Sequence, residues 1–258
     1  MTDLTRGTSH DVLRYTGNPL DVMFAPQSVA VIGASDRKGS IGRTVIPNLL
    51  DSPYKGEIYA VNPQFFTILD RKSYAHVGQI GKSIDLAVVA TPVETVPGIV
   101  RECVEAGVTS CAIISAGIKE TGPRGATLEQ AVLAEARRGS IRLVGPNCLG
   151  IMNPYIGLNA TFASRMALKG NVGFASQSGA LFTAIVDWSI RENVGISSFI
   201  STGSMVDVDW GDLIHYFGDD PRTKSILIYM ETIGEARSFM SAAREVALTK
   251  PIIVMKPG

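Results

Sequence analysis

Three glycines lie within the stretch 33–42, which joins a short apolar run, 28–35, to a segment with helical spacing. Gly33 ends the apolar run, and Gly39 and Gly42 follow it in GASDRKGSIG. A continuous apolar run of this length is typical of a strand buried on both faces. Glycine lets the backbone approach a phosphate, and a helix start offers free N–H groups and a positive dipole end. The stretch is therefore a candidate site for a nucleotide-type cofactor, with a tight ligand-free turn as the alternative.

The residues after the next strand bear on which nucleotide this turn would hold. That strand ends in Val61-Asn62-Pro63-Gln64, where a dinucleotide site usually places a carboxylate on the ribose. No carboxylate stands there, which argues against NAD. The glycine spacing also differs from the standard G-x-G-x-x-G. The turn also lacks G-x-x-x-x-G-K-S/T, which disfavours a P-loop NTPase.

Three further strand ends carry small or polar residues. They are Ala90-Thr91-Pro92, Ser115-Ala116-Gly117 and Gly145-Pro146-Asn147-Cys148. The carboxyl ends of parallel strands share one edge of a sheet, and ligands bind at that edge. Each run alone is a routine turn, but their joint placement favours a long ligand in a narrow cleft over a compact one.

A second candidate turn, Ser176-Gln177-Ser178-Gly179, also joins an apolar run to a segment with helical spacing. Hydroxyl side chains and a glycine at a helix start are typical of an anion site. The alternative is an ordinary helix N-cap made by Ser178, and the local pattern alone favours that alternative. Glu231 ends another apolar run, YMET, where its carboxylate faces either the ligand edge or solvent.

Other polar residues lack the spacing of a metal or nucleophile site. Asp207, Asp209 and Asp212 are irregularly spaced with no nearby histidine, which favours a polar loop and helix start over a metal site. The three histidines have no acidic partner close in sequence on a strand-end loop, which favours structural roles: His10, His76 and His215. We predict no metal site.

The composition is that of a globular chain. Of 258 residues, 45% are apolar and 19% are charged, and the formal net charge is zero. A balanced charge implies no basic face, so nucleic acid is not a predicted partner. No stretch approaches the roughly 20 apolar residues that cross a bilayer, and the polar N-terminus is unlike a signal peptide. Three cysteines without C-x-x-C spacing are typical of reduced, buried thiols, so we predict a cytoplasmic protein without membrane contact.

Strand and helix patterns alternate from residue 28 to the end, which predicts an α/β fold with parallel, doubly wound sheets. The predicted division is a flexible leader at 1–21, a Rossmann-like domain at 22–152 and a second parallel α/β domain at 153–258. The Gly-, Asn- and Pro-rich run 150–170 is predicted to be a loop at the junction. Because the last residues directly follow a strand, we expect the second domain to be truncated and the chain to be part of a longer protein.

Several runs, taken in order, carry a resemblance to a known family. They are SVAVIGASDRKGSIGRTVIPNLL, VNP, ATP, IISAG, VGPNCLGIMNP, GLNATF, FASQSGAL, DWG and SILIYMETI. Over about residues 22–258 the chain resembles the nucleoside-diphosphate-forming (ADP-forming) acyl-CoA synthetases. It is also similar to the α subunit of succinyl-CoA synthetase, which shares GPNC and the S-x-S-G turn. LNATF, VDVDWGDL and EARSFMSAARE look most like long members fused to ATP-grasp and GNAT acetyltransferase domains.

The resemblance implies that 22–152 binds coenzyme A (CoA) or acyl-CoA and that 153–258 is flavodoxin-like. The implied CoA-binding residues are Gly33, Ser35, Asp36, Gly39, Ile41, Asn62, Pro63, Thr91, Pro92, Ser115, Ala116, Gly117 and Asn147. Asn147 would lie near the thiol end. Relatives often carry a lysine just after the second-strand proline, whereas Gln64 and Phe65 follow it here. This departure implies weaker phosphate affinity, or substitution by Arg37 and Lys38.

In the second half, the resemblance implies that Ser176, Ser178 and Gly179 bind the phosphate being transferred. Glu231 would orient the histidine that becomes phosphorylated, and no histidine of this chain matches that one. The implied reaction runs from acyl-CoA and phosphate through acyl phosphate and phosphohistidine to ADP. ADP, ATP and Mg²⁺ would enter only through an ATP-grasp domain or β subunit, so we expect this chain alone to be inactive.

Two other functions stay open at this point. One is a CoA-sensing regulatory region of a GNAT-type protein lysine acetyltransferase fusion, and the other is a stand-alone CoA-binding or redox-sensing protein. The second domain counts against the stand-alone alternative. The sequence leaves open the acyl group and whether the chain forms a homo-oligomer.

Overall fold

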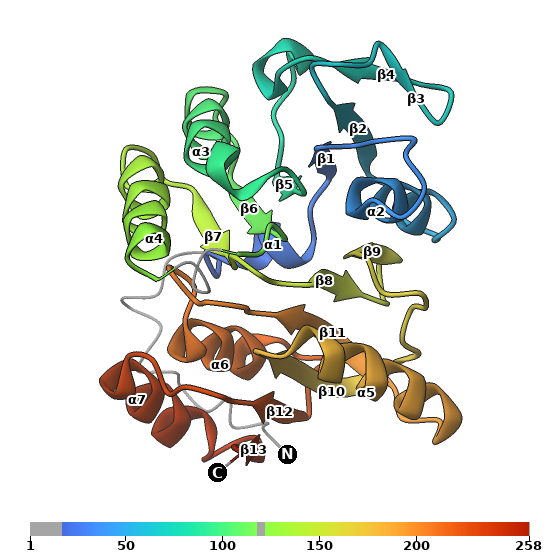
Figure 1. The fold of residues 1–258 in the computed structure, drawn as a ribbon. Coiled ribbons are helices and arrows are strands. Elements are labelled where there is room, and N and C mark those ends of the chain that lie inside the picture. The colour runs from blue at the N-terminus through green and yellow to red at the C-terminus, as the bar shows by residue number, and fades with distance from the viewer. Residues whose placement is uncertain (1–16, 118–121, 258) are drawn as a thin grey trace, which may run out of the picture.

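The computed structural model describes residues 17–117 and 122–257. They form two sheets, one above the other in Figure 1, with helices around them. The first sheet has the strand order β3-β4-β2-β1-β5-β6-β7. The second has the order β13-β12-β10-β11-β8-β9. Both sheets are predominantly parallel, so the predicted α/β class with two successive domains is confirmed.

The first domain is built around a buried central strand. Its parallel strands are β1 (Ser28–Ile32), β2 (Glu57–Val61), β5 (Leu86–Val89), β6 (Ser110–Ile113) and β7 (Arg142–Val144). Every residue of β1, β5 and β6 is buried, as continuous apolar runs predict for strands covered on both faces.

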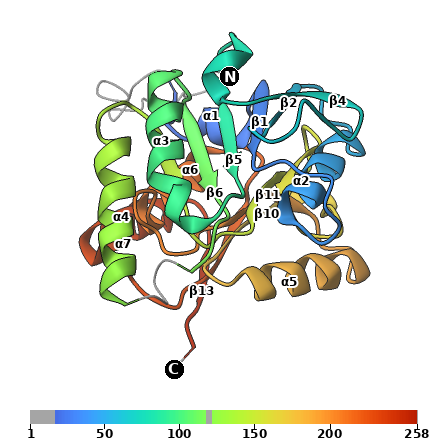
Figure 2. The ribbon, with the colours of Figure 1, turned by 45° about the horizontal axis from the view of Figure 1, so that its top comes forward.

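Helices cover both faces of this first sheet. They are α2 (Ile41–Leu50), α3 (Val96–Glu105) and α4 (Pro123–Ala136), with short 3₁₀ turns at Val77–Ile80 and Val93–Thr95. Val45 and Leu49 of α2 pack in one core cluster with Val29 of β1. Val100 of α3 packs in another with Ala30, the next residue of β1. Alternate residues of one strand thus face opposite helix layers, and Figure 2 shows α2 on one side and α3 with α4 on the other.

A hairpin that the sequence analysis did not anticipate extends the first sheet. Its strands are β3 (Thr67–Ile68) and β4 (Arg71–Tyr74), and β4 pairs in parallel with β2. Leu69 and Asp70 form the tip with positive φ angles of 49° and 58°. The strands are too short and too polar to give a readable alternation, and the tip Leu69-Asp70 is not a typical hairpin-turn pair.

The second domain repeats the parallel plan. Its strands β10 (Lys169–Ser176), β11 (Ile196–Ser201), β12 (Ser225–Tyr229) and β13 (Ile252–Met255) match the four predicted ones. Its helices are α5 (Gly179–Arg191), α6 (Trp210–Asp219) and α7 (Ala236–Val246). Phe182 of α5 packs with Phe174 and Phe199 of the sheet, and α6 and α7 pack on the other core.

The predicted loop at 150–170 was wrong, because this run contains two strands. β8 (Gly150–Asn153) pairs antiparallel with β11, and β9 (Leu158–Thr161) pairs antiparallel with β8. Glycine, asparagine and proline suggested a loop, but all of these strand residues are buried and the pairing satisfies their backbone groups. The predicted boundary between residues 152 and 153 falls inside β8.

The packed structure begins before the predicted end of the leader. Residues 1–16 lie outside the described residues, so that part of the leader prediction stays a prediction. Leu20, however, is only 1% exposed, and α1 (Asp21–Phe24) follows it. The Phe24 ring stacks on Tyr216 at 4.0 Å, and the Asn153 side-chain amide donates to the Phe24 carbonyl at 2.9 Å. This short segment therefore lies against the second domain as a fixed part of the fold.

Polar contacts join the two domains. The Arg142 guanidinium at the start of β7 bridges Asp207 at 3.0 Å and Asp212 at 2.8 Å, and the Asp207 carboxylate also accepts from the Leu143 N–H at 2.7 Å. On the opposite side, the Asn48 amide of α2 donates to the carbonyl of Thr161, the last residue of β9, at 2.8 Å. The irregular aspartate cluster is thus a structural anchor, because two of its members hold an arginine of the other domain.

The described residues include no helix that is long and apolar enough to span a membrane. Nor do they include a group of three or more His, Cys, Asp and Glu residues placed to share a metal ion. The three cysteines are buried free thiols: Cys103, Cys111 and Cys148.

Candidate functional site

The first glycine turn is shaped by close backbone packing at two of its three glycines. Gly33 has φ 89°, and a Cβ there would lie 2.5 Å from the Ala90 carbonyl oxygen. A Cβ on Gly42 would clash with the carbonyl oxygen of Gly33 itself. These two glycines let α2 start directly against the ends of β1 and β5, which is a structural requirement independent of any ligand.

Gly39 differs from its neighbours because its surroundings are empty. Its φ is 78°, and a Cβ there would meet nothing within 4 Å. The next residue, Ser40, caps α2 by accepting from the Arg43 N–H at 3.3 Å. Gly39 therefore presents bare backbone beside the first N–H groups of α2, and a helix start of this kind attracts anions.

Two other residues predicted to bind CoA make contacts within the protein. The Ser35 hydroxyl accepts from the Arg37 N–H at 3.0 Å. The Asp36 carboxylate accepts from the Leu69 N–H of the β3–β4 hairpin at 2.9 Å and lies 3.6 Å from the Arg43 guanidinium. These bonds fix the shape of the turn and connect it to the hairpin.

Asn62, at the end of β2, connects that strand end to the first turn. Its side-chain amide donates to the Ala34 carbonyl at 2.7 Å, and its Oδ1 accepts from the Gln64 N–H at 2.9 Å. Its backbone N–H donates to the Tyr74 carbonyl at 2.8 Å. Asn62 is thus a positioning residue in this structure, and Pro63 beside it is exposed.

The remaining strand ends of the first domain lie side by side, as predicted for parallel strands. The Ser115 hydroxyl after β6 donates to the Thr91 carbonyl after β5 at 2.7 Å. The Asn147 N–H after β7 donates to the Ser115 carbonyl at 3.0 Å. The intervening Pro92 and Ala116 are exposed on this edge. The edge is continuous from β5 to β7, and it leads toward the second domain.

The second turn is held by side chains. The Ser176 hydroxyl, which is fully buried, accepts from the Ser178 N–H at 3.1 Å and donates to the Ser178 carbonyl at 2.9 Å. Ser178 caps α5 by accepting from the Leu181 N–H at 3.3 Å. A Cβ on Gly179 would meet only Leu149, at the ordinary distance of 3.6 Å. The predicted N-cap is therefore present, and it leaves the start of α5 open.

Gln177 is the residue of this turn that the sequence analysis did not assign a role. Its Oε1 accepts from the backbone N–H groups of Glu231 at 2.7 Å and Thr232 at 2.8 Å, and its Nε2 donates to the Thr232 hydroxyl at 3.0 Å. Gln177 thereby fixes Glu231 beside the second turn. Its place inside S-Q-S-G was the only available signal, because the partners are more than fifty positions away.

A cavity of about 410 Å³ lies where the two domains meet. It brings together residues from three separate predictions: Asn147, the turn residues Ser178 and Gly179, and Glu231. Its other lining residues are Cys148, Leu149, Phe162, Gln177, Ala180 and Thr183. The cavity therefore has a helix N-terminus and hydroxyl groups on one side and the end of the first domain's strand-end edge on the other.

The thiol in this cavity is chemically quiet. Cys148 Sγ donates to the Ile113 carbonyl at 3.2 Å, and burial raises the pKa of this thiol to about 12. A neutral thiol is a poor nucleophile at physiological pH. The site therefore offers hydrogen-bond donors and a carboxylate, and it has no activated nucleophile of its own among its lining residues.

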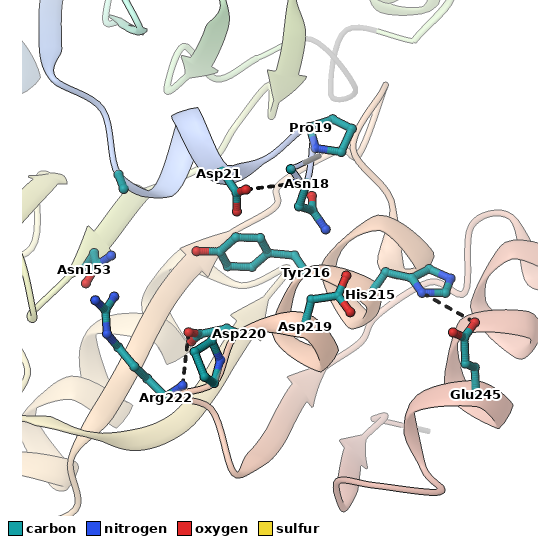
Figure 3. A pocket seen from close by; sticks show the side chains of 13 residues that line it. Asn18, Pro19, Asp21, Asn153, His215, Tyr216, Asp219, Asp220, Arg222 and Glu245 are labelled. Atoms are coloured by element: carbon teal, nitrogen blue, oxygen red, sulfur yellow. Dashed lines mark hydrogen bonds and ion pairs between the residues drawn. The ribbon is translucent and has the colours of Figure 1, made fainter. Parts of the chain in front are cut away.

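A second, larger cavity of about 760 Å³ lies at the far side of the second domain and contains none of the predicted ligand residues. Figure 3 shows its lining side chains, which come from the segment at the start of α1, the end of β8, α6 with the loop after it, and the end of α7. Within it, His215 Nδ1 lies 3.9 Å from Glu245, and the Asp220 carboxylate accepts from the Arg222 N–H at 3.2 Å.

Two domain families match the chain. Residues 27–154 match the family described as CoA binding domain, and residues 169–258 match the succinyl-CoA ligase like flavodoxin domain. The fold and the two turns thus define a class, a CoA-binding domain followed by a ligase-type flavodoxin domain.

Curated relatives narrow this class. The chain is 43% identical over 239 residues to the ADP-forming acetate–CoA ligase I of Archaeoglobus fulgidus, covering 93% of this chain and 35% of that protein. It is 42% identical to the α subunit of the ADP-forming acetate–CoA ligase I of Pyrococcus furiosus, covering 93% of this chain and 53% of that subunit.

A solved structure gives the same result. The dinucleotide forming acetyl-coenzyme A synthetase 1 of Candidatus Korarchaeum cryptofilum, in complex with phosphate and ADP, superposes with a TM-score of 0.88 and 39% identity. The superposition covers 93% of this chain and 52% of the Korarchaeum chain. The chain belongs to the ADP-forming acyl-CoA synthetase family, and it spans about half or less of the length of these relatives.

Proposed function

We propose that this chain forms the CoA-binding part and half of the phosphate site of an ADP-forming acyl-CoA synthetase. The complete enzyme would convert acyl-CoA, phosphate and ADP into the free acid, CoA and ATP. The observation that carries the proposal is the 410 Å³ cavity, in which Asn147 of the first domain meets Ser178 and Glu231 of the second.

The first domain would hold CoA along its strand-end edge. The nucleotide phosphates would lie against Gly39 and the start of α2, where the backbone is open. The pantetheine chain would follow the strand ends past Thr91 and Ser115, which are already hydrogen-bonded in a row. Its thiol would reach the cavity near Asn147. A long ligand fits this path because the edge runs from the first turn to the domain junction.

The second domain would hold the transferred phosphate. The free N–H groups at the start of α5 and the hydroxyl of Ser178 favour a phosphate there, and Gly179 leaves space for it. Phosphate bound to the Korarchaeum relative supports an anion role for this family. Glu231, fixed by Gln177, would orient the histidine that carries the phosphate.

That histidine would come from elsewhere in the complete enzyme. Of the two histidines in the described residues, His76 and His215, neither lines the cavity. An ATP-grasp domain or β subunit is the partner we propose for ADP, ATP and Mg²⁺. Acetate is the acyl group that the relatives' names favour, and we infer the cytoplasm as the compartment.

Calorimetric titration of the chain with CoA, acetyl-CoA and NAD tests the proposal. We expect both CoA forms to bind and NAD not to bind. Gly39→Leu should abolish CoA binding, because the side chain fills the open backbone and strains a positive φ. Gly81→Leu is the matched control, since Gly81 has φ 71° and equally empty surroundings away from the turn.

Equal loss of CoA binding in both glycine variants would assign the effect to backbone strain and would contradict the turn as the CoA-binding site. Binding of NAD without CoA would overturn the whole assignment. We also expect no ATP formation from ADP, acetyl-CoA and phosphate by this chain alone, and measurable ATP formation would contradict the proposed division of the site.

A further inference from the structure

Two adjacent, exposed phenylalanines lie between β2 and β3, directly before β3. Phe66 is 93% exposed and Phe65 is 46% exposed. Phe66 is the most exposed large apolar side chain in the described part of the sequence. Most large apolar residues of the chain are buried, so an aromatic ring left this open has a surface available for a ligand.

The backbone that carries these rings is fixed on both sides. Before them, the Phe65 N–H donates to the Asn62 carbonyl at 3.5 Å, within the turn that the Asn62 side chain closes. After them, the Phe66 carbonyl accepts from the Ser73 N–H of β4 at 2.9 Å. The rings are therefore presented from an ordered turn, and ordering them on binding costs little backbone entropy.

This turn also lies against the first glycine turn. The Asn62 amide donates to the Ala34 carbonyl at 2.7 Å, and the Asp36 carboxylate accepts from the Leu69 N–H at the tip of the hairpin at 2.9 Å. Figure 1 shows the β3–β4 hairpin beside the loop between β1 and α2. The hairpin and the turn before it therefore adjoin the loop that leads to the start of α2.

The chemistry of the two features is complementary along one ligand. The glycine turn offers open backbone N–H groups and the exposed side chains of Arg37 and Lys38, which suit phosphates. The phenylalanine pair offers an uncharged π surface, which suits a purine base and contributes nothing to a phosphate. In CoA, an adenine lies next to the phosphates, so the order of groups on the ligand matches the order of features on the protein.

We propose that Phe66, with Phe65 beside it, stacks on the adenine of CoA. This contact would make the chain prefer ligands that carry adenosine over ligands that lack it. The proposal rests on the proposed function, because it assumes that CoA lies in the first turn.

The test compares two ligands that differ in the nucleotide part. Wild-type chain and Phe66→Ala are titrated with CoA and with 4′-phosphopantetheine, which lacks the adenosine together with its 3′-phosphate and one phosphate of the diphosphate. We expect Phe66→Ala to weaken CoA binding about tenfold, the effect of losing one base–aromatic stack, and to leave the affinity for 4′-phosphopantetheine unchanged. Phe66→Trp should keep the affinity for CoA near that of the wild type. Leu248→Ala should change the affinity for neither ligand, because Leu248 is 85% exposed but lies after α7.

A second readout reports stacking directly. Etheno-adenine CoA should lose fluorescence on binding to the wild-type chain and to Phe66→Trp, and lose much less on binding to the double variant Phe65→Ala/Phe66→Ala. CoA that binds equally well to wild type and Phe66→Ala overturns the stacking proposal while the proposed function stands. Equal weakening of both ligands also overturns it. A wild-type chain that binds no CoA defeats the proposed function itself.

Discussion

The two strand-to-helix turns each lead into a helix start, and they differ in construction. At 33–42, glycine backbones pack against one another, and Gly42 sits where any side chain would strike the Gly33 carbonyl. At 176–179, a buried hydroxyl and a glutamine hold the turn, and Gly179 has ordinary space around it. The comparison shows that a helix start can be left uncovered either by the absence of side chains or by hydrogen bonds that hold the side chains in place.

The difference also separates structural glycines from candidate ligand glycines. Gly33 and Gly42 are required by the fold, whereas Gly39 and Gly179 are not crowded by neighbours. A motif of repeated glycines therefore mixes two requirements, and only the three-dimensional contacts distinguish them. The following changes test this distinction, beginning with the largest expected effect.

Gly42→Ala should destabilise the chain strongly, because the new methyl group overlaps backbone that cannot move without shifting α2 from β1. We expect a loss of about 3 kcal/mol in the free energy of unfolding, the upper range for overpacking. Gly179→Ala is the counterpart in the second turn and should change stability by less than about 1 kcal/mol. Urea denaturation of both variants measures the contrast, and similar losses at the two positions would refute it.

Arg142→Met tests whether the ion pairs between the two domains, which carry one turn each, contribute to stability. The guanidinium bridges Asp207 and Asp212 while only 26% exposed, so its removal leaves two partly buried carboxylates without their cation. We expect a loss of about 2–3 kcal/mol, reduced from the fully buried case by the remaining solvent contact. Differential scanning calorimetry measures it. Arg101→Met removes a half-exposed guanidinium whose partner Glu135 keeps its ion pair with Arg138, and it should have little effect.

Gln177→Leu should loosen the second turn. It removes the acceptor for the backbone N–H groups of Glu231 and Thr232, and unsatisfied donors of this kind cost about 2 kcal/mol. Gln177→Glu keeps the accepting oxygen and should recover most of that stability. Thermal melts followed by circular dichroism compare the two. A glutamate variant as unstable as the leucine variant would show that these N–H bonds are not what holds the turn.

The smallest expected effects are those of the two helix caps. Ser40→Ala and Ser178→Ala each remove an acceptor at the start of a helix and should each cost about 1 kcal/mol. Aspartate at either position restores an acceptor and should recover the stability. Chemical denaturation of the four variants makes the comparison. A cap loss at one turn only would mean that the two helix starts are not equivalent.

Much of this arrangement was readable from local patterns. The continuous apolar runs predicted buried parallel strands, and the small residues at their ends predicted one shared edge, which the bonds among Thr91, Ser115 and Asn147 confirm. Three features were missed, the β3–β4 hairpin, the antiparallel pair β8–β9 and the buried start near Leu20. Each depends on pairing or packing with distant residues. Short polar or glycine-containing segments carry no local pattern that predicts such contacts.

The sequence by itself determined the α/β class, the order of the two domains, the two strand-to-helix turns and the family. Periodicity, turn residues and motif order can be read along the chain, without knowledge of tertiary contacts. Only the tertiary structure decided that Asn147, Ser178 and Glu231 share one cavity, that Gln177 fixes Glu231, and that Asp207 and Asp212 anchor Arg142. These results depend on residues far apart in the chain that the packing of the two domains brings together.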